Sequence, residues 1–446
     1  MKKRINHLFL FFVLVFVTIS LKAQETTSTF SLDQATQYAM QNSYVLFNTK
    51  QDVTIAQKKV WETITTGLPQ VSASANYNWN LNLPVSLIPA EFVGGEEGEY
   101  ISVKFGQDYN ADFGFSVSQQ VFDGSWVVGV SSAELYLNMA KQTNEKTAID
   151  IRDAVAQAYY AVLISDRYKK VMIENLENRT RLYEETKVYY ENGFREQQDV
   201  DQLRINQKNA ENEVLRAERE LTIAKTVLKY TMGYNLDNEI ILSDELETFV
   251  LPLVEERNTV TLDLVNHIDY RIATSNFEVS DKLFQLEKAA YLPRLDAFYS
   301  YSRTSFANKP NLFKEQWYPS SLIGFQASIP IFNSGTKRAK VQQARMELDK
   351  AENDRRYTEI TLQKDYLTAS AEMETAREQF LNTQENRDLA ESILDKSQIK
   401  FNNGMISSAE LSQQETQYIN TWQQLVTSTL SLLQADISLK KAAGAL

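Results

Sequence analysis

The chain has 446 residues, no cysteine and only two histidines. Without cysteine it can form no disulfide, and no thiolate can act as a nucleophile or a metal ligand. Acidic residues outnumber basic ones by 58 to 46, which gives a formal net charge of −12 and argues against nucleic-acid binding. Glycine and proline are scarce, with 14 and 8 copies, and this composition favours long helices.

Residues 1–23 have the pattern of an export signal. Three basic residues precede an apolar run from Leu8 to Ile19, and Ala23 stands before the predicted cleavage site. The apolar run is short for a membrane span, and no later stretch is long and apolar enough to form one. Cleavage removes four basic residues and no acidic ones, leaving 42 against 58, a net charge of −16. We predict an exported, acidic protein.

The mature chain begins with a helical pattern from Ser31 to about Thr66. Ser31 and Gln34 form a predicted capping box, and Gly67 and Pro69 end the pattern. Two segments follow in which apolar and polar residues alternate, and a loop at about 81–107 separates them. A second pair of such segments flanks a loop at about 303–320. Their apolar and aromatic positions are Val71, Ala73, Ala75, Tyr77 and Trp79; Tyr109, Ala111, Phe113, Phe115 and Val117; Leu295, Ala297, Tyr299 and Tyr301; Ile323, Phe325, Ala327 and Ile329.

Alternation of this kind predicts strands. Serine, asparagine and glutamine dominate the opposite face of each strand, where a soluble sheet would carry more charge. A half-buried soluble sheet remains the alternative. However, one apolar, aromatic face and one face of small polar side chains favour an outer-membrane barrel with a water-filled interior.

A very long helix is predicted after each pair of strands, at about 125–190 and 335–401. Each contains no proline, and roughly 65 helical residues span roughly 100 Å. Asn192-Gly193 and Asn403-Gly404 then predict left-handed turns. Return helices follow, because apolar residues recur at three-to-four or seven-residue spacing across about 200–228 and 411–439. Two antiparallel helical hairpins are therefore expected.

The chain also repeats itself. Tyr190-Glu191-Asn192-Gly193-Phe194 returns as Phe401-Asn402-Asn403-Gly404-Met405, 211 residues later, and Leu68-Pro69 returns as Leu292-Pro293. Thr261-Leu262-Asp263 is expected to restart the unit that Ser31-Leu32-Asp33 begins. The predicted organisation is a signal peptide at 1–23, a first repeat at 24–232, a connector at 233–260 and a second repeat at 261–446.

One chain supplies four strands, too few to close a barrel. Open edges would leave backbone groups unpaired in lipid. About eight strands already make a filled barrel, and a water channel needs more, so three chains with a shared barrel are the smallest open solution. We predict a mainly helical homotrimer, with a twelve-stranded β-barrel in the outer membrane and a helical tunnel extending into the periplasm.

Residues 25–446 resemble the TolC family of outer-membrane efflux proteins. The resemblance rests on the order of motifs that are individually weak: the start at 31–33, the Leu-Pro junctions, the strand-to-helix joints at 121–124 and 331–335, the tip motifs at 190–193 and 401–404, and the end at 442–446. It implies a passive exit duct of a tripartite efflux or type I secretion system. The implied partners are a periplasmic adaptor (a membrane fusion protein) and an inner-membrane pump of the RND or ABC type.

In this family, acidic residues just after the second tip turn form a ring that narrows the periplasmic entrance. The matching positions are Glu410 and Gln413, with Asp199 and Gln202 as their counterparts in the first copy. Because one acid of the usual pair is an amide here, a weaker negative constriction is expected. Stabilisation of a helix's first turn is another reason for Glu410 and Asp199. The adaptor is expected to dock at the tip turns, which contain Tyr190, Gly193, Phe401 and Gly404.

No motif indicates an enzyme. His267 is the only histidine of the mature chain, on a predicted helix, and we find no phosphate-binding loop or nucleophile elbow. We predict no catalytic group, no cofactor and no metal. The alternative function is a non-transporting periplasmic coiled-coil protein, structural or adhesive. It would explain the leader and the helices but not the two copies of the strand pairs.

Overall fold

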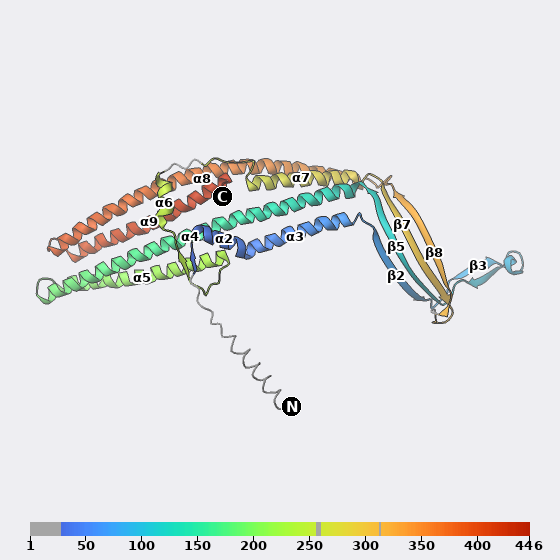
Figure 1. Ribbon diagram of the computed structural model, residues 1–446, viewed down its shortest axis with the longest axis horizontal. Coiled ribbons are helices and arrows are strands. Elements are labelled where there is room, and N and C mark those ends of the chain that lie inside the picture. The colour runs from blue at the N-terminus through green and yellow to red at the C-terminus, as the bar shows by residue number, and fades with distance from the viewer. Residues whose placement is uncertain (1–27, 256–259, 312–313) are drawn as a thin grey trace, which may run out of the picture. The chain divides into compact units, whose positions relative to one another are not determined.

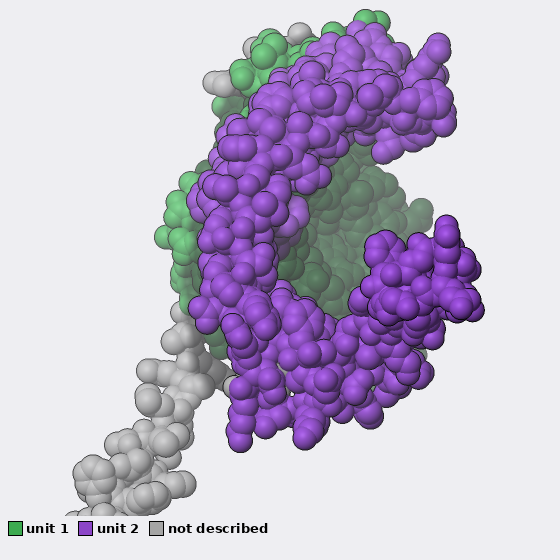
Figure 2. All heavy atoms as spheres, turned by 90° about the vertical axis from the view of Figure 1, so that its right-hand side faces the viewer, with its two compact units in different colours: residues 1–51, 142–272, 356–446 green, residues 52–141, 273–355 purple. Residues whose placement is uncertain are grey.

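The computed structural model describes residues 28–255, 260–311 and 314–446 (Figure 1). The predicted export signal at 1–23 lies outside them. The chain divides into two compact units, coloured separately in Figure 2. In the described residues, unit 1 comprises 28–51, 142–272 and 356–446, and unit 2 comprises 52–141 and 273–355. Each unit therefore contains segments of both predicted repeats.

The first elements confirm the predicted capping box but not a single helix. Helix α2 (Leu32–Asn42) begins after Ser31, whose Oγ accepts a hydrogen bond from Gln34 N at 3.2 Å, while Gln34 Oε1 accepts one from Ser31 N at 3.0 Å. The prediction of one helix to Thr66 is wrong, because Ser43 has extended backbone angles (φ −63°, ψ 126°). Helix α3 (Tyr44–Thr65) starts anew there. Serine hydroxyls bond to nearby backbone and so compete with an unbroken helix.

Unit 2 contains a four-stranded antiparallel sheet in the order β2-β5-β7-β8. Its strands are β2 (Gln70–Trp79), β5 (Tyr109–Asp123), β7 (Arg294–Ala307) and β8 (Trp317–Ser328). The segment predicted as a loop at 81–107 contains an additional hairpin, β3 (Val85–Pro89) and β4 (Tyr100–Lys104), with a short 3-10 helix at Ala90–Val93. The second loop is shorter than predicted, because β7 extends to Ala307.

The register of the sheet aligns the predicted faces across all four strands. Val71, Val117, Tyr299 and Ile323 form one row of paired residues on the apolar face. On the other face small polar side chains pair directly. Ser72 Oγ lies 2.8 Å from Ser116 Oγ, and Asn76 Nδ2 donates to Asp112 Oδ2 at 2.9 Å. The alternation predicted from the sequence is thus carried from strand to strand as two continuous surfaces.

The helical part consists of two antiparallel hairpins, as predicted. Helix α4 (Gly124–Glu191) returns as α5 (Gln197–Met232), and α8 (Thr336–Asn402) returns as α9 (Ser408–Ala443). With 68 and 67 residues, α4 and α8 are each about 100 Å long. Among the described helices, none combines the length and apolar character needed to span a bilayer.

Short elements connect the hairpins to the rest of the chain. Strand β1 (Ser28–Phe30) pairs in parallel with β6 (Ile240–Leu242), which precedes α6 (Leu246–Glu255). The segment from Thr261, which is predicted to restart the repeated unit, begins with a turn. Asp263 accepts a hydrogen bond from Asn266 N at 3.2 Å in this turn, and α7 (Ile268–Ala289) begins after it.

The core of unit 1 lies where the hairpins meet these short elements. Tyr159 on α4 is fully buried, and its hydroxyl donates to Asp244 Oδ2 at 2.9 Å and lies 3.0 Å from the carbonyl oxygen of Phe30. Leucines of both return helices, including Leu228 and Leu432, are buried in the same cluster. Burial of these apolar stripes is the main stabilisation of such long helices.

Candidate functional site at the helical tips

Both tip turns adopt the predicted left-handed conformation. Gly193 has φ of 79° and Gly404 has φ of 72°. In each turn the following residue closes the helix end. Phe194 N donates to Tyr189 O at 2.9 Å, and Met405 N donates to Lys400 O at 2.9 Å. A Cβ added at either glycine would meet nothing within 4 Å, so glycine is required there for its backbone conformation and not for space.

Phe401, predicted as a docking residue, is only 1% exposed. It packs in a cluster with Leu182, Leu203, Leu394 and Leu411, and the Arg195 guanidinium carbon lies 4.2 Å from its ring centroid. Arg195 also donates to the carbonyl oxygen of Phe401. Phe401 therefore joins the two hairpins at their tips.

The most exposed large apolar side chains at the tips are those of the residues directly after the glycines. Phe194 is 78% exposed and Met405 is 72% exposed, whereas Tyr190 is only partly exposed. Sequence reasoning did not select Phe194 or Met405, although they occupy equivalent positions of the repeat. The signal that could have found them is a large apolar residue directly after the glycine in both copies of the tip motif.

The four residues predicted to line the entrance lie in the first turns of the return helices. Glu410 and Gln413 on α9 are exposed, and Glu410 N donates to Ser407 Oγ, the helix cap, at 3.2 Å. Asp199 and Gln202 on α5 are half-buried. An acid in the first turn also stabilises its own helix. The role of these residues in an entrance constriction stays a prediction.

A buried polar network that the sequence did not reveal lies beside these residues. Glu415 on α9 is 3% exposed, and its Oε2 accepts a hydrogen bond from Asn206 Nδ2 on α5 at 3.1 Å. Arg179 Nε on α4 lies 3.7 Å from the same oxygen, and Arg179 Nη1 donates to Asn206 O at 3.1 Å. Asn206 Nδ2 also donates to Ser412 Oγ at 2.5 Å. The network thus links the two hairpins through one buried carboxylate.

Burial raises the pKa of the Glu415 carboxyl above its ordinary value, and Arg179 and Asn206 oppose that rise. Asn206, which the sequence analysis did not single out, occupies a buried position of α5. A polar residue at a buried position of a long amphipathic helix calls for a partner, and Glu415 provides it.

His267, the one histidine of the predicted mature chain, has a local structural setting. It is buried directly before α7 and not within a helix as predicted, and its Nδ1 accepts a hydrogen bond from Asp269 N at 3.2 Å. Its Nε2 lies 3.3 Å from the carbonyl oxygen of Lys441. In the part of the chain that the structure describes, no group of three or more histidine, aspartate or glutamate side chains could hold a metal ion.

An apolar-faced sheet joined to two long helical hairpins defines a class of outer-membrane channel proteins. The family model described as outer membrane efflux protein matches the chain over residues 35–234 and again over 263–445. The chain belongs to this family, and the resemblance to TolC-type proteins is confirmed. It is an outer-membrane efflux channel protein, with its helical part in the periplasm.

Solved structures confirm the fold class. CusC is 17% identical with a TM-score of 0.72, and the match covers 96% of each chain. VceC from Vibrio cholerae is 16% identical with a TM-score of 0.70, covering 93% of this chain and 96% of the other. The open-state MtrE channel of Neisseria gonorrhoeae is 15% identical with a TM-score of 0.72, covering 93% and 88%. A comparison with curated proteins found no match.

Proposed function

We propose that three copies of this chain form the exit duct of a tripartite efflux or type I secretion system. The duct passively conducts substrates from the periplasm or the pump to the exterior. The observation that carries this proposal is the open sheet. Strands β2 and β8 each pair with one neighbour only among the described strands. Unit 2, drawn in purple in Figure 2, curves as an open arc.

Open edges are incompatible with lipid, where every backbone group must find a partner. The apolar row through Val71 and Ile323 reaches both edges of the sheet. Pairing of β8 with β2 of another copy would continue both faces around a closed barrel. Three copies leave an open lumen, whereas two would give a barrel of about eight strands, which side chains fill.

The proposed partners follow from the tips. A periplasmic adaptor docks at the two tip turns, where Phe194 and Met405 are exposed, and links the duct to an inner-membrane pump of the RND or ABC type. Energy comes from the pump, so the chain needs no catalytic group of its own. The non-transporting coiled-coil alternative gives no role to the continuous apolar face of the sheet.

Cysteine cross-linking of the edge strands tests the trimer, because the natural chain has no cysteine that could interfere. Ser72 or Ser74 on β2 is replaced with cysteine together with Ser320, Leu322 or Gln326 on β8. A disulfide requires Cα atoms within about 4.4–6.8 Å, so a pair that faces its counterpart across the protomer boundary is expected to give a covalent trimer on non-reducing gels.

Two controls sharpen this experiment. Each single-cysteine variant is expected to remain monomeric under denaturing conditions. The pair Ser74→Cys and Ser302→Cys is also expected to remain monomeric, because β5 separates these two positions in the sheet. Dimers as the largest species, or monomers from every edge pair, would contradict the trimeric barrel.

The tips give a second prediction. Replacing Gly193 or Gly404 with valine forces a β-branched residue into a left-handed turn, which costs at least about 1–2 kcal/mol. We expect reduced export in cells that carry the matching pump, with a normal amount of protein in the outer membrane. Gly404→Asn is the matched control, because asparagine tolerates this conformation. Normal export by both valine variants would argue against docking at the tips.

A further inference from the structure

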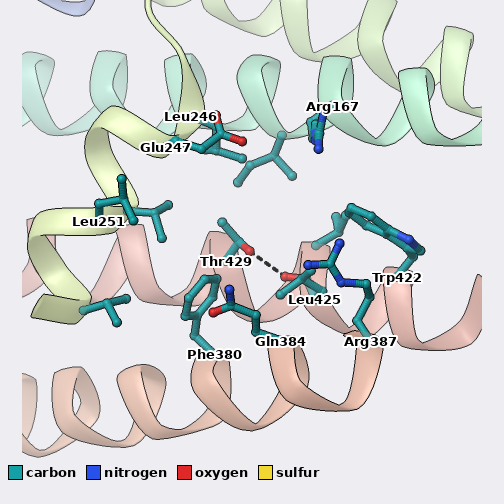
Figure 3. Close-up of a pocket in the computed structure, with 14 residues that line it drawn as sticks. Arg167, Leu246, Glu247, Leu251, Phe380, Gln384, Arg387, Trp422, Leu425 and Thr429 are labelled. Carbon is teal, nitrogen blue, oxygen red and sulfur yellow. Dashed lines mark hydrogen bonds between the residues drawn. The ribbon is translucent and has the colours of Figure 1, made fainter. Parts of the chain in front are cut away.

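Unit 1 contains a cavity of about 190 Å³ between α4, α6, α8 and α9 (Figure 3). Helix α6 covers it from one side, and α8 and α9 form the opposite wall. Its apolar lining consists of Ile164, Leu246, Val250, Leu251, Val254, Phe380, Trp422, Leu425 and Val426. All of these residues belong to one chain, so the lining uses no residue of another copy.

Two guanidinium groups lie beside the apolar surface. The Arg387 guanidinium carbon is 4.8 Å from the ring centroid of Trp422, and that of Arg167 is 6.0 Å from it. Arg387 Nη2 pairs with Asp388 at 2.7 Å, but its buried Nε has no hydrogen-bond acceptor. A buried hydrogen-bond donor without an acceptor lowers the stability of the fold. A ligand that supplied an acceptor to Arg387 Nε would remove this cost.

The charges of the lining limit what can bind. Arg167 and Arg387 contribute two positive charges to the lining and Glu247 one negative charge, and Asp388, outside the lining, already pairs with Arg387 Nη2. These charges balance, so a ligand is needed less for net charge than as a hydrogen-bond acceptor for Arg387 Nε, which lacks one. In size, an apolar cavity of about 150 Å³ accommodates benzene. A cavity of about 190 Å³ therefore fits one aromatic ring with a small substituent.

We propose that this cavity binds a small aromatic monoanion, a single ring that carries one carboxylate or sulfonate. The ring packs against Trp422 and Phe380, and the anionic group accepts hydrogen bonds from Arg387 and Arg167. Guanidinium–carboxylate pairs of this kind are strong and geometrically specific. Such a ligand contacts both α4 and α9, so it would also tie the two hairpins together and stabilise unit 1.

The test uses the full-length protein in a nonionic detergent, with benzoate as the probe and calorimetry or ligand-observed NMR as the readout. Benzamide has the same shape without the charge, and acetate has the charge without the ring. Benzoate is expected to bind saturably with a dissociation constant of about 1 mM or below. Both comparison compounds are expected to bind at least about tenfold more weakly, benzamide because a charged hydrogen bond is lost and acetate because the buried apolar surface of the ring is lost.

Variants locate the site. Arg387→Gln is expected to weaken benzoate binding by about tenfold or more. Arg167→Gln, at an exposed position on α4, repeats the test without disturbing the core. Lys364→Gln is the matched control, because this exposed residue on α8 lies outside the lining, and its binding should equal that of the natural chain. Equal affinity for benzoate and benzamide, unchanged binding in both arginine variants, or no saturation at about 10 mM benzoate would overturn the proposal.

Discussion

Replacing Arg179 with methionine is expected to loosen the helical tips at neutral pH by about 3–5 kcal/mol, the cost of leaving a buried charge without its partner. Glu415 is 3% exposed, and Arg179 is its one cationic partner within 4 Å in the described chain. Methionine keeps most of the apolar stem of arginine, so the loss reports the missing charge more than missing packing.

Hydrogen exchange of tip peptides, such as 179–206 and 394–415, measures this loss locally. Glu415→Gln is the matched control, because the amide oxygen can still accept the hydrogen bond from Asn206. The double variant, Arg179→Met with Glu415→Gln, is expected to recover most of the protection, since no charge remains buried. Equal loss of protection in the double variant and in Arg179→Met would show that the ion pair does not hold the tips.

The same network gives the sign of a pH dependence. Burial raises the pKa of Glu415 in the folded tip above its ordinary value of 4.5. At a pH between the ordinary pKa and the raised pKa, the folded tip therefore binds more protons than the unfolded chain. Stability of the tip therefore falls as pH rises through that window and is highest below it. Arg179 lowers the pKa of Glu415 against the rise caused by burial. Without it the carboxyl is neutral only at acidic pH, so Arg179→Met should match the natural chain in exchange protection only there.

Much of the fold could be predicted because its elements are long and uninterrupted. Helices of 68 and 67 residues keep one periodicity over many turns, and the tip glycines mark their ends. The strands were predicted from alternation, which the observed register extends across the sheet. The break at Ser43 was missed because one serine among helix formers leaves the periodicity almost unchanged. The hairpin of β3 and β4 was missed because its strands have five residues each.

The site was predicted less completely, because its key contacts are between distant segments. In the sequence, Glu415 and Arg179 look like ordinary charged residues on helix surfaces. They are buried together only because α4, α5 and α9 pack against one another. Phe401 matched a tip motif, but a motif does not indicate which of its side chains point inward. Exposed Phe194 and buried Phe401 occupy similar turns and have opposite environments.

Removing the acidic residues at the entrance is expected to change ion selectivity. In the proposed trimer, three copies each of Glu410 and Asp199 place up to six carboxylates near one constriction. Charges that converge in a water-filled constriction attract cations and repel anions, and salt weakens the effect. The natural channel in a planar bilayer should therefore prefer cations and be blocked by multivalent cations added from the periplasmic side. Glu410→Gln with Asp199→Asn should reduce both effects.

A second pair of substitutions controls for total charge. Glu62→Gln with Glu347→Gln also removes two acids per chain, both from exposed positions on α3 and α8, outside the tip turns. Because these acids lie outside the tip turns, beside Lys59 and Lys350, their loss should leave selectivity and block nearly unchanged. If the Glu410 and Asp199 double variant behaves like this control, these residues do not line the constriction. The acidic excess of the chain would then act elsewhere along the tunnel wall.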